Sequence, residues 1–166
     1  AGTAAATAVG TMVAKSVSSF ADYEQLTGGV DTLFKDSSAA VQKYANDAYK
    51  TAGLSANSYM ETVTNFSASL ISSLNGDTAK AADYANSALV DMADNANKIG
   101  TSMESIQNAY QGFAKQNYTM LDNLKLGYGG TKSEMERLLA DATALSGVEY
   151  DLDSLSDVYS AIHVIQ

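Results

Sequence analysis

The chain has 166 residues, of which 46 % are hydrophobic, a formal net charge of −9 at pH 7, and no Cys, Pro or Trp. The lack of Cys excludes disulfides and thiolate chemistry, and the acidic balance argues against nucleic-acid binding, which requires clustered Lys and Arg to contact phosphates. The lack of Pro is typical of long helices, because a Pro inside a helix costs about 3 kcal/mol.

Apolar residues recur at steps of three and four along most of the chain, which is the spacing of one helical face. The longest regular run extends from Met103 to Leu124, and the two-residue alternation of a strand is nowhere sustained. In chain order this spacing predicts helices over 3–27, 30–34, 38–52, 56–74, 78–99, 102–126, 132–146 and 154–165. We expect Gly28-Gly29 to break the first two, residues 127–130 to form a loop, and residues 148–151 to be briefly extended.

Glycines followed by capping side chains mark three of the predicted boundaries: Gly76-Asp77, Gly100-Thr101 and Gly130-Thr131. In the last two, Glu104 and Glu134 stand three residues after the Thr, which completes a capping box. Ser58 and Ser154 are weaker candidates for helix caps. The sequence therefore predicts an all-α fold of about six to seven helices, separated by Gly-containing junctions, in an elongated bundle that we expect to be oligomeric.

The two ends of the chain suggest a segment of a longer protein. The first residue is Ala1 and not an initiator Met, and Ile162, Val164 and Ile165 keep the sequence apolar up to Gln166. No domain boundary is evident, so residues 1–166 are expected to form a single helical segment of a longer chain.

The stretch from Gly127 to Ser133 resembles a phosphate-binding loop at first sight. A Walker loop ends in adjacent Gly and Lys residues and follows an apolar strand. Here Thr131 separates Gly130 from Lys132, and no strand is predicted before them. A flexible loop followed by a helix cap explains these residues better than nucleotide binding.

The acidic residues Asp151, Asp153 and Asp157 suggest a calcium loop. An EF-hand requires Gly at its sixth position and a bidentate Glu at its twelfth. Ser156 and Ile162 occupy those positions. A solvated acidic turn that caps the last helix is the expected structure.

Residues for catalysis or metal binding do not form a recognisable set. His163 is the only His, whereas a zinc site requires three or four ligands. Glu134 and Glu136 lie two residues apart and so point to different sides of one helix. We therefore expect no enzyme activity, no catalytic residue, no metal and no cofactor.

Aromatic residues gather around the longest predicted helix: Tyr110, Phe113, Tyr118 and Tyr128. Tyr is favoured at contact surfaces, so these four form a candidate partner-contact surface. The more ordinary interpretation is that they fill gaps in an Ala-rich core. Asn117 falls within the same apolar seam, where a polar residue either sets register and oligomeric state or simply faces solvent.

Three runs of sequence resemble tail tape-measure proteins of long-tailed bacteriophages and related prophages. They are SYMETVTNFSASLI at 58–71, DMADNANKIG at 91–100 and, most specifically, IQNAYQGFAKQNYTMLDNLKLGYGGTK at 106–132. The resemblance extends from about Tyr23 to Gln166. It implies a mostly helical virion structural protein that lies in the lumen of the tail tube and sets the length of the tail.

The same resemblance implies partners and a sequence of events. The partners are the tail tube protein, the tail-tip or baseplate proteins, the tail assembly chaperone and further copies of the chain, with no binding to nucleic acid. Such proteins leave ahead of the DNA during genome ejection and transiently contact the host envelope. The negative net charge is compatible with this role, because the acidic protein and the outgoing DNA repel each other. The alternative is a secreted helical binding module or toxin-like effector, since Cys-free chains rich in Ser, Thr and Asn also occur there.

Overall fold

Helices account for most of the chain in the computed structural model, which describes residues 20–166 and contains no strand within them. A first helix covers residues 20–34. It is followed by η1 (Lys35–Ser37), α2 (Ser38–Thr51), α3 (Ala56–Ser73), α4 (Thr78–Ile99), α5 (Met103–Ala114), η2 (Leu121–Leu124), α6 (Lys132–Ser146) and α7 (Leu155–Ile165). The all-α prediction is confirmed.

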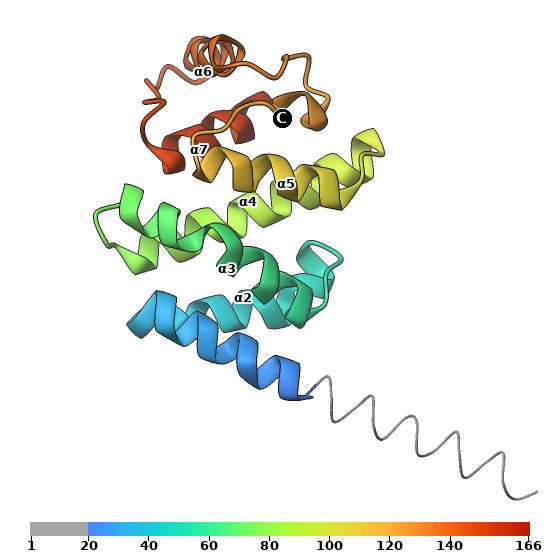
Figure 1. Ribbon diagram of the computed structural model, residues 1–166, viewed down its shortest axis with the longest axis vertical. Helices are drawn as coiled ribbons and strands as arrows, with labels where there is room; N and C mark the ends of the chain where they lie inside the picture. The colour runs from blue at the N-terminus through green and yellow to red at the C-terminus, as the bar shows by residue number, and fades with distance from the viewer. Residues whose placement is uncertain (1–19) are drawn as a thin grey trace, which may run out of the picture.

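The helices stack in layers along the longest axis of the molecule (Figure 1). The helix over 20–34 and α2 form one end, α3 and α4 the middle, α5 and α7 the next layer, and α6 the other end. α3 and α4 both contact α2, α5 and α7, whereas α6 packs mainly on α7. The arrangement is a compact, bundle-like stack in which the two middle helices connect the layers on either side.

Large and small side chains are divided between the two middle helices. α3 buries bulky residues at helical spacing, among them Tyr59, Phe66 and Leu70. The buried positions of α4 begin with Ala81, Ala82, Ala85 and Ala88. The methyl groups of α4 let its neighbours approach closely, and the bulk of α3 fills the remaining space, which gives the dense packing of a protein interior.

The predicted caps of α4, α6 and α7 are confirmed. The side chain of Asp77 accepts a hydrogen bond from the Lys80 N–H at 3.0 Å, and Thr131 Oγ1 accepts one from the Glu134 N–H at 3.2 Å. Ser154 caps α7 in the same way. These side chains satisfy N–H groups that have no partner within the helix.

Two predicted caps are wrong by one and three residues. The cap of α5 is Ser102 and not Thr101, since Ser102 Oγ accepts from the Ser105 N–H at 3.1 Å. The cap of α3 is Ser55, whose Oγ accepts from the Ser58 N–H at 3.1 Å. In both cases a nearby Ser with extended backbone competed with the residue that the sequence pattern favoured.

The expected helix over 102–126 ends at Ala114, so the prediction is wrong for its second half. Gln116 adopts a left-handed backbone with φ of 58°. Its N–H donates to Phe113 O at 3.0 Å, and the Asn117 N–H donates to Gly112 O at 2.8 Å. This pair of bonds is a Schellman motif, which closes the helix by satisfying its last carbonyls.

The chain then folds back on itself between α5 and α6. Asn117 is exposed and lies outside any helix, so it does not occupy a helical seam. Its Oδ1 accepts from the Thr119 N–H at 3.1 Å. Gly130 packs so tightly against the Thr119 backbone that a Cβ there would overlap it. A Gly is required at this approach, which explains one of the glycines in the loop.

Gly28 and Gly29 do not break the first helix, contrary to expectation, because residues 20–34 are continuously helical. Val30 and Phe34, on the far side of the glycines, are fully buried. Their burial stabilises the continuation by more than the roughly 1 kcal/mol that each Gly costs in a helix. The part of the expected 3–27 helix that precedes residue 20 lies outside the described residues.

Replacing Gly28 or Gly29 with Ala should raise the free energy of unfolding by about 0.5–1 kcal/mol each. A Cβ at either position meets no atom within 4 Å. Urea unfolding followed by circular dichroism measures the change. Gly100→Ala is the matched control: Gly100 ends α4 with φ of +79°, so Ala there should destabilise. A loss of stability in both Gly28→Ala and Gly29→Ala would contradict a continuous helix.

Candidate functional site

Three of the four aromatic residues considered as a partner surface lie in the core. Tyr110 is 1 %, Phe113 2 % and Tyr118 8 % exposed. The ring of Tyr110 lies 5.8 Å from that of Phe113, which in turn lies 6.2 Å from Tyr118, measured between centroids. They fill the interior, as the second of the two interpretations held, and offer little area to a partner in this structure.

Tyr159 of α7 joins this aromatic cluster from the facing helix. Its ring centroid lies 5.0 Å from that of Tyr110, and its hydroxyl donates to the Tyr110 carbonyl at 2.9 Å. The Tyr110 hydroxyl is also buried, but it has no hydrogen-bond partner among the described residues. Burial raises the pKa of Tyr110 well above its ordinary value, so the hydroxyl stays protonated.

Removing the Tyr159 hydroxyl and removing the Tyr110 hydroxyl should change the free energy of unfolding in opposite directions. Tyr159→Phe should lower the free energy of unfolding by about 0.5–1.5 kcal/mol, because a satisfied buried hydrogen bond is lost. Tyr110→Phe should raise it by about 1 kcal/mol, because the cost of burying an unpaired hydroxyl disappears. Thermal or urea unfolding of the two single variants gives the comparison. Equal destabilisation by both would mean that the Tyr110 hydroxyl has a partner.

Tyr128, the fourth residue of the set, fastens the loop before α6. The guanidinium of Arg137 lies 4.2 Å from the centre of its ring, a cation–π contact. Its hydroxyl donates to Asp141 Oδ2 at 2.5 Å. Burial and this hydrogen bond raise the pKa of Tyr128 to about 12. Tyr128 therefore holds the loop onto the exposed side of α6.

Side chains of α6 also occupy the backbone groups of the loop that resembles a phosphate site. The Gly129 N–H donates to Glu134 Oε1 at 3.2 Å, and Arg137 donates to Gly127 O at 2.9 Å. Arg137 also pairs with Glu134 at 2.6 Å. An internal carboxylate thus takes the N–H that a phosphate would use. Glu136, two residues on, is exposed and points to another side of the helix.

The acidic turn before α7 is held together by hydrogen bonds from its backbone N–H groups to its own carboxylates. The Asp151 N–H donates to Asp157 Oδ2 at 2.9 Å, and the Asp153 N–H donates to Asp151 Oδ1 at 2.9 Å. No group of three or more His, Asp or Glu side chains within residues 20–166 is arranged to hold a metal ion. The carboxylates of Asp151 and Asp157 accept hydrogen bonds within the turn, while the cap of α7 itself is Ser154.

Asp91 of α4 and His163 of α7 form a pair that the sequence did not reveal. His163 Nδ1 lies 2.9 Å from Oδ1 and 3.0 Å from Oδ2 of Asp91. Asp91 is only 6 % exposed, although the His163 side chain is 64 % exposed. Burial raises the pKa of Asp91, while the hydrogen bond and charge of His163 lower it. A carboxylate is thus held inside the stack by one histidine.

Further polar contacts surround this pair and connect three elements. Gln166 Nε2 donates to the Asp91 carbonyl at 2.7 Å, which holds the end of α7 on α4. Asn95, one turn after Asp91, donates to Leu124 O of η2 at 2.9 Å and accepts from Thr101 Oγ1 at 2.7 Å. These bonds give the buried Asn95 amide the hydrogen-bond partners that a buried polar group needs. They also fix η2 against α4.

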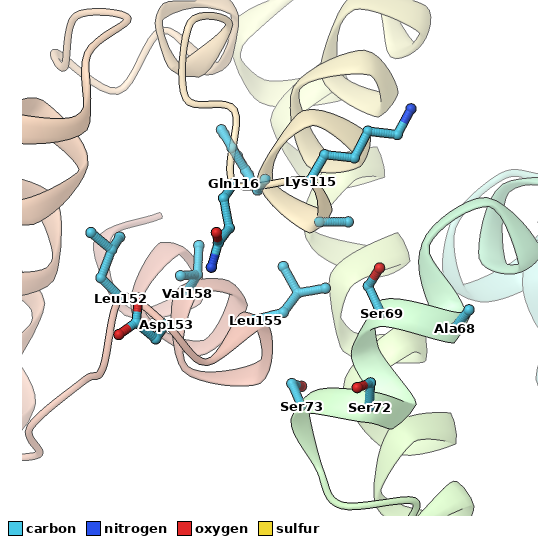
Figure 2. A pocket seen from close by; sticks show the side chains of 12 residues that line it. Ala68, Ser69, Ser72, Ser73, Lys115, Gln116, Leu152, Asp153, Leu155 and Val158 are labelled. Carbon is cyan, nitrogen blue, oxygen red and sulfur yellow. The ribbon is translucent and has the colours of Figure 1, made fainter.

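A groove lies where α3, the end of α5 and the start of α7 meet. Its volume is about 640 Å³. Figure 2 shows small side chains such as Ser69 and Ser72 on the α3 side and Leu155 and Val158 on the α7 side. Gln116 points toward α7, whereas the Lys115 side chain extends away from it. The lining consists mainly of small hydroxyl and apolar side chains, with one Lys, one Gln and one Asp.

No family model, curated protein or solved structure matches this chain. Among the described residues, no helix is both long enough and apolar enough to cross a membrane. The polar clusters at the loop, the turn and the Gln166 end of α7 mainly hold helices to one another.

Proposed function

We propose that this chain is a structural segment of a phage tail tape-measure protein. The observation that carries the proposal is the resemblance of residues 23–166, above all the run over 106–132. Two properties support it. The described chain is built of helices, the element that measures length in such proteins, and its polar clusters cap and connect helices.

The compact stack and a role along the tail tube imply two arrangements of the same helices. Fully straight, 166 residues of helix would cover roughly 250 Å, at 1.5 Å per residue. The turns that contain Gly76, Gly100 and Gly147 allow the helices to fold back, and each of these glycines has a positive φ. We propose that the helices persist in the tail and that only the Gly-containing junctions between them straighten.

Straightening would expose the side chains that hold the layers together. Tyr59, Phe66 and Leu70 are 0–1 % exposed in the stack, and their faces would meet water if α3 parted from α4 and α7. Burying each such side chain is worth about 1.5–3 kcal/mol. The straight state therefore requires other apolar surfaces, for which further copies of the chain, the tube protein and the tail-tip proteins are the proposed sources. The assembly chaperone would keep the chain from premature association.

The net charge of −9 supports the remaining part of the proposal, which is release ahead of the DNA. An acidic protein in a narrow tube is repelled by the phosphate backbone and so does not retard it. The proposed location is the tail lumen of the virion, with transient contact to the host envelope during ejection.

Measuring tail length tests directly whether this chain sets the length of the tail. In the phage or prophage that encodes this chain, an in-frame duplication of residues 20–166 should lengthen the tail by about 1.5 Å per added residue, measured by electron microscopy. A variant with the exposed change Tyr49→Ala and no added residue is the control. Unchanged length in the duplication would contradict a ruler role, and recovery of the chain outside virions would favour a secreted binding module.

The proposed change from a compact stack to a straightened arrangement has a separate test. Small-angle scattering of the isolated chain should fit the compact stack, while density in intact tails should show straightened junctions at Gly76, Gly100 and Gly147. Identical junction geometry in both would contradict the rearrangement and leave the ruler role intact.

A further inference from the structure

A cleft of about 330 Å³ opens beside the Asp91–His163 pair, between α4 and α7. This volume is within the range of small-molecule sites. Tyr150, from the turn before α7, contributes a third wall. The cleft is separate from the groove of Figure 2, which lies at the other end of α7.

Helical spacing explains why these side chains share one cleft. On α4 the lining residues are Tyr84, Ser87, Ala88 and Asp91, which stand at steps of three and four and so lie on one face. On α7 the lining residues fall into two neighbouring pairs one turn apart: Tyr159, Ser160, His163 and Val164. The two faces meet because α4 packs against α7.

Several of the polar atoms that line this cleft are hydrogen-bond acceptors. Within the described residues the Asp91 carboxylate receives a hydrogen bond from His163 alone, although a carboxylate has about four acceptor positions. The Tyr150 hydroxyl donates its proton to Ser146 Oγ at 3.0 Å, and the Ser160 hydroxyl donates to Ser156 O at 2.8 Å. These hydroxyls therefore present lone pairs and no free proton.

We propose that this cleft binds a primary ammonium group on an alkyl stem, either as a small free amine or as a Lys side chain of another chain. An ammonium group has three donors and no acceptor, which complements the acceptors of the cleft. Tyrosine rings attract cations, and Ala88 and Val164 supply apolar contact for the stem. Anions are disfavoured, since they would face a buried carboxylate in a protein of net charge −9.

Burial supports the same conclusion from the side of Asp91. Its pKa is raised by burial despite the lowering effect of His163, and the nearby Asp94 raises it further. A positive group beside the carboxylate would offset the cost of burying its charge. The inference stands independently of the tape-measure proposal, since it depends only on the chemistry of the cleft.

The test uses n-butylammonium chloride as the probe, at constant pH and ionic strength, with the ring signals of His163 and the tyrosines followed by NMR. His163 is the only His, so its imidazole gives one unambiguous reporter. We expect saturable shifts at His163, Tyr84 and Tyr150, and none with n-butanol, which has the same stem without the charge. A five-residue peptide with one central Lys, compared with its Nε-acetylated form, tests the second source.

Asp91→Asn should weaken butylammonium binding at least tenfold, whereas Asp47→Asn, which removes an exposed charge on α2, should leave it unchanged. Ser87→Leu is a second variant, because Ser87 is exposed and a larger side chain there blocks the cleft without altering the core. Binding of butylammonium, the Lys peptide or both supports the proposal and identifies the source. The proposal is overturned if neither butylammonium nor the Lys peptide binds saturably, or if n-butanol binds as well as butylammonium. It is also overturned if the Asp91→Asn and Ser87→Leu variants bind butylammonium as well as the wild type does.

Discussion

Phe66→Ala should lower the free energy of unfolding by about 3–5 kcal/mol, the largest single effect expected here. Phe66 is 1 % exposed on α3, and its ring meets that of Tyr159 edge to face, with centroids 5.6 Å apart and planes at 90°. Truncation removes both the buried area and this aromatic contact, and it leaves a cavity between α3 and α7. Denaturant unfolding at constant pH measures the loss.

Two further variants make that result specific. Phe66→Leu retains most of the buried volume and should fall between the wild type and Phe66→Ala. Tyr49→Ala removes a larger side chain, but Tyr49 is 80 % exposed, so its change should stay within about 0.5 kcal/mol. Similar values for Phe66→Ala and Tyr49→Ala would show that α3 and α7 do not pack against each other through Phe66 in solution.

Local signals predicted much of this fold from the sequence. The bounds of α4 and α6 agree with prediction to the residue, because a capping side chain begins each helix and a glycine in the left-handed region ends it. Both signals act within a few residues, so no tertiary information is needed to read them. The all-α class followed from the same spacing of apolar residues.

The two misjudged helices show where local signals fail. In α5 the apolar spacing continues past Ala114, but the helix stops because Gln116, not a glycine, takes the left-handed position. In the helix over 20–34 the opposite holds, since Gly28 and Gly29 are glycines in an ordinary helical backbone. Burial of Val30 and Phe34 determines that outcome, and burial is a property of the whole fold.

The candidate sites depended still more on contacts between distant residues. Asp91 and His163 are 72 positions apart, so neither could be assigned a partner from spacing. A signal did exist in α4, where Asp91 and Asn95 fall on or beside its Ala-rich buried face and therefore needed polar partners. For Tyr110 and Phe113, periodicity identified a common face and could not say whether protein or solvent covers it.

The second large effect concerns the buried carboxylate and its histidine. His163→Ala should lower the free energy of unfolding at pH 7 by about 2–4 kcal/mol, somewhat below the range for a fully buried pair because His163 is largely exposed. The variant leaves the Asp91 carboxylate, which is 6 % exposed in the wild type, without its hydrogen-bond donor. The cost is that of an uncompensated charge inside the protein.

The pH dependence of that cost follows from the raised pKa of Asp91. A folded-state pKa above the unfolded value, about 3.9 for Asp, means that folding favours the protonated carboxyl, so stability falls as pH rises through this interval. His163 opposes the shift by stabilising the charged form. Without it the pKa of Asp91 should rise further, and the penalty of His163→Ala should be small near pH 4 and grow toward pH 7.

Asp91→Asn separates charge from shape in the same measurement. The amide is nearly isosteric and neutral, so this variant should be at least as stable as the wild type at pH 7 and should lose the pH dependence that Asp91 contributes. In the Asp91→Asn background, His163→Ala should cost about the same at pH 4 and pH 7, because no carboxylate remains to be charged. If His163→Ala alone showed equal penalties at both pH values, the hydrogen bond and not the buried charge would account for the coupling of α4 to α7.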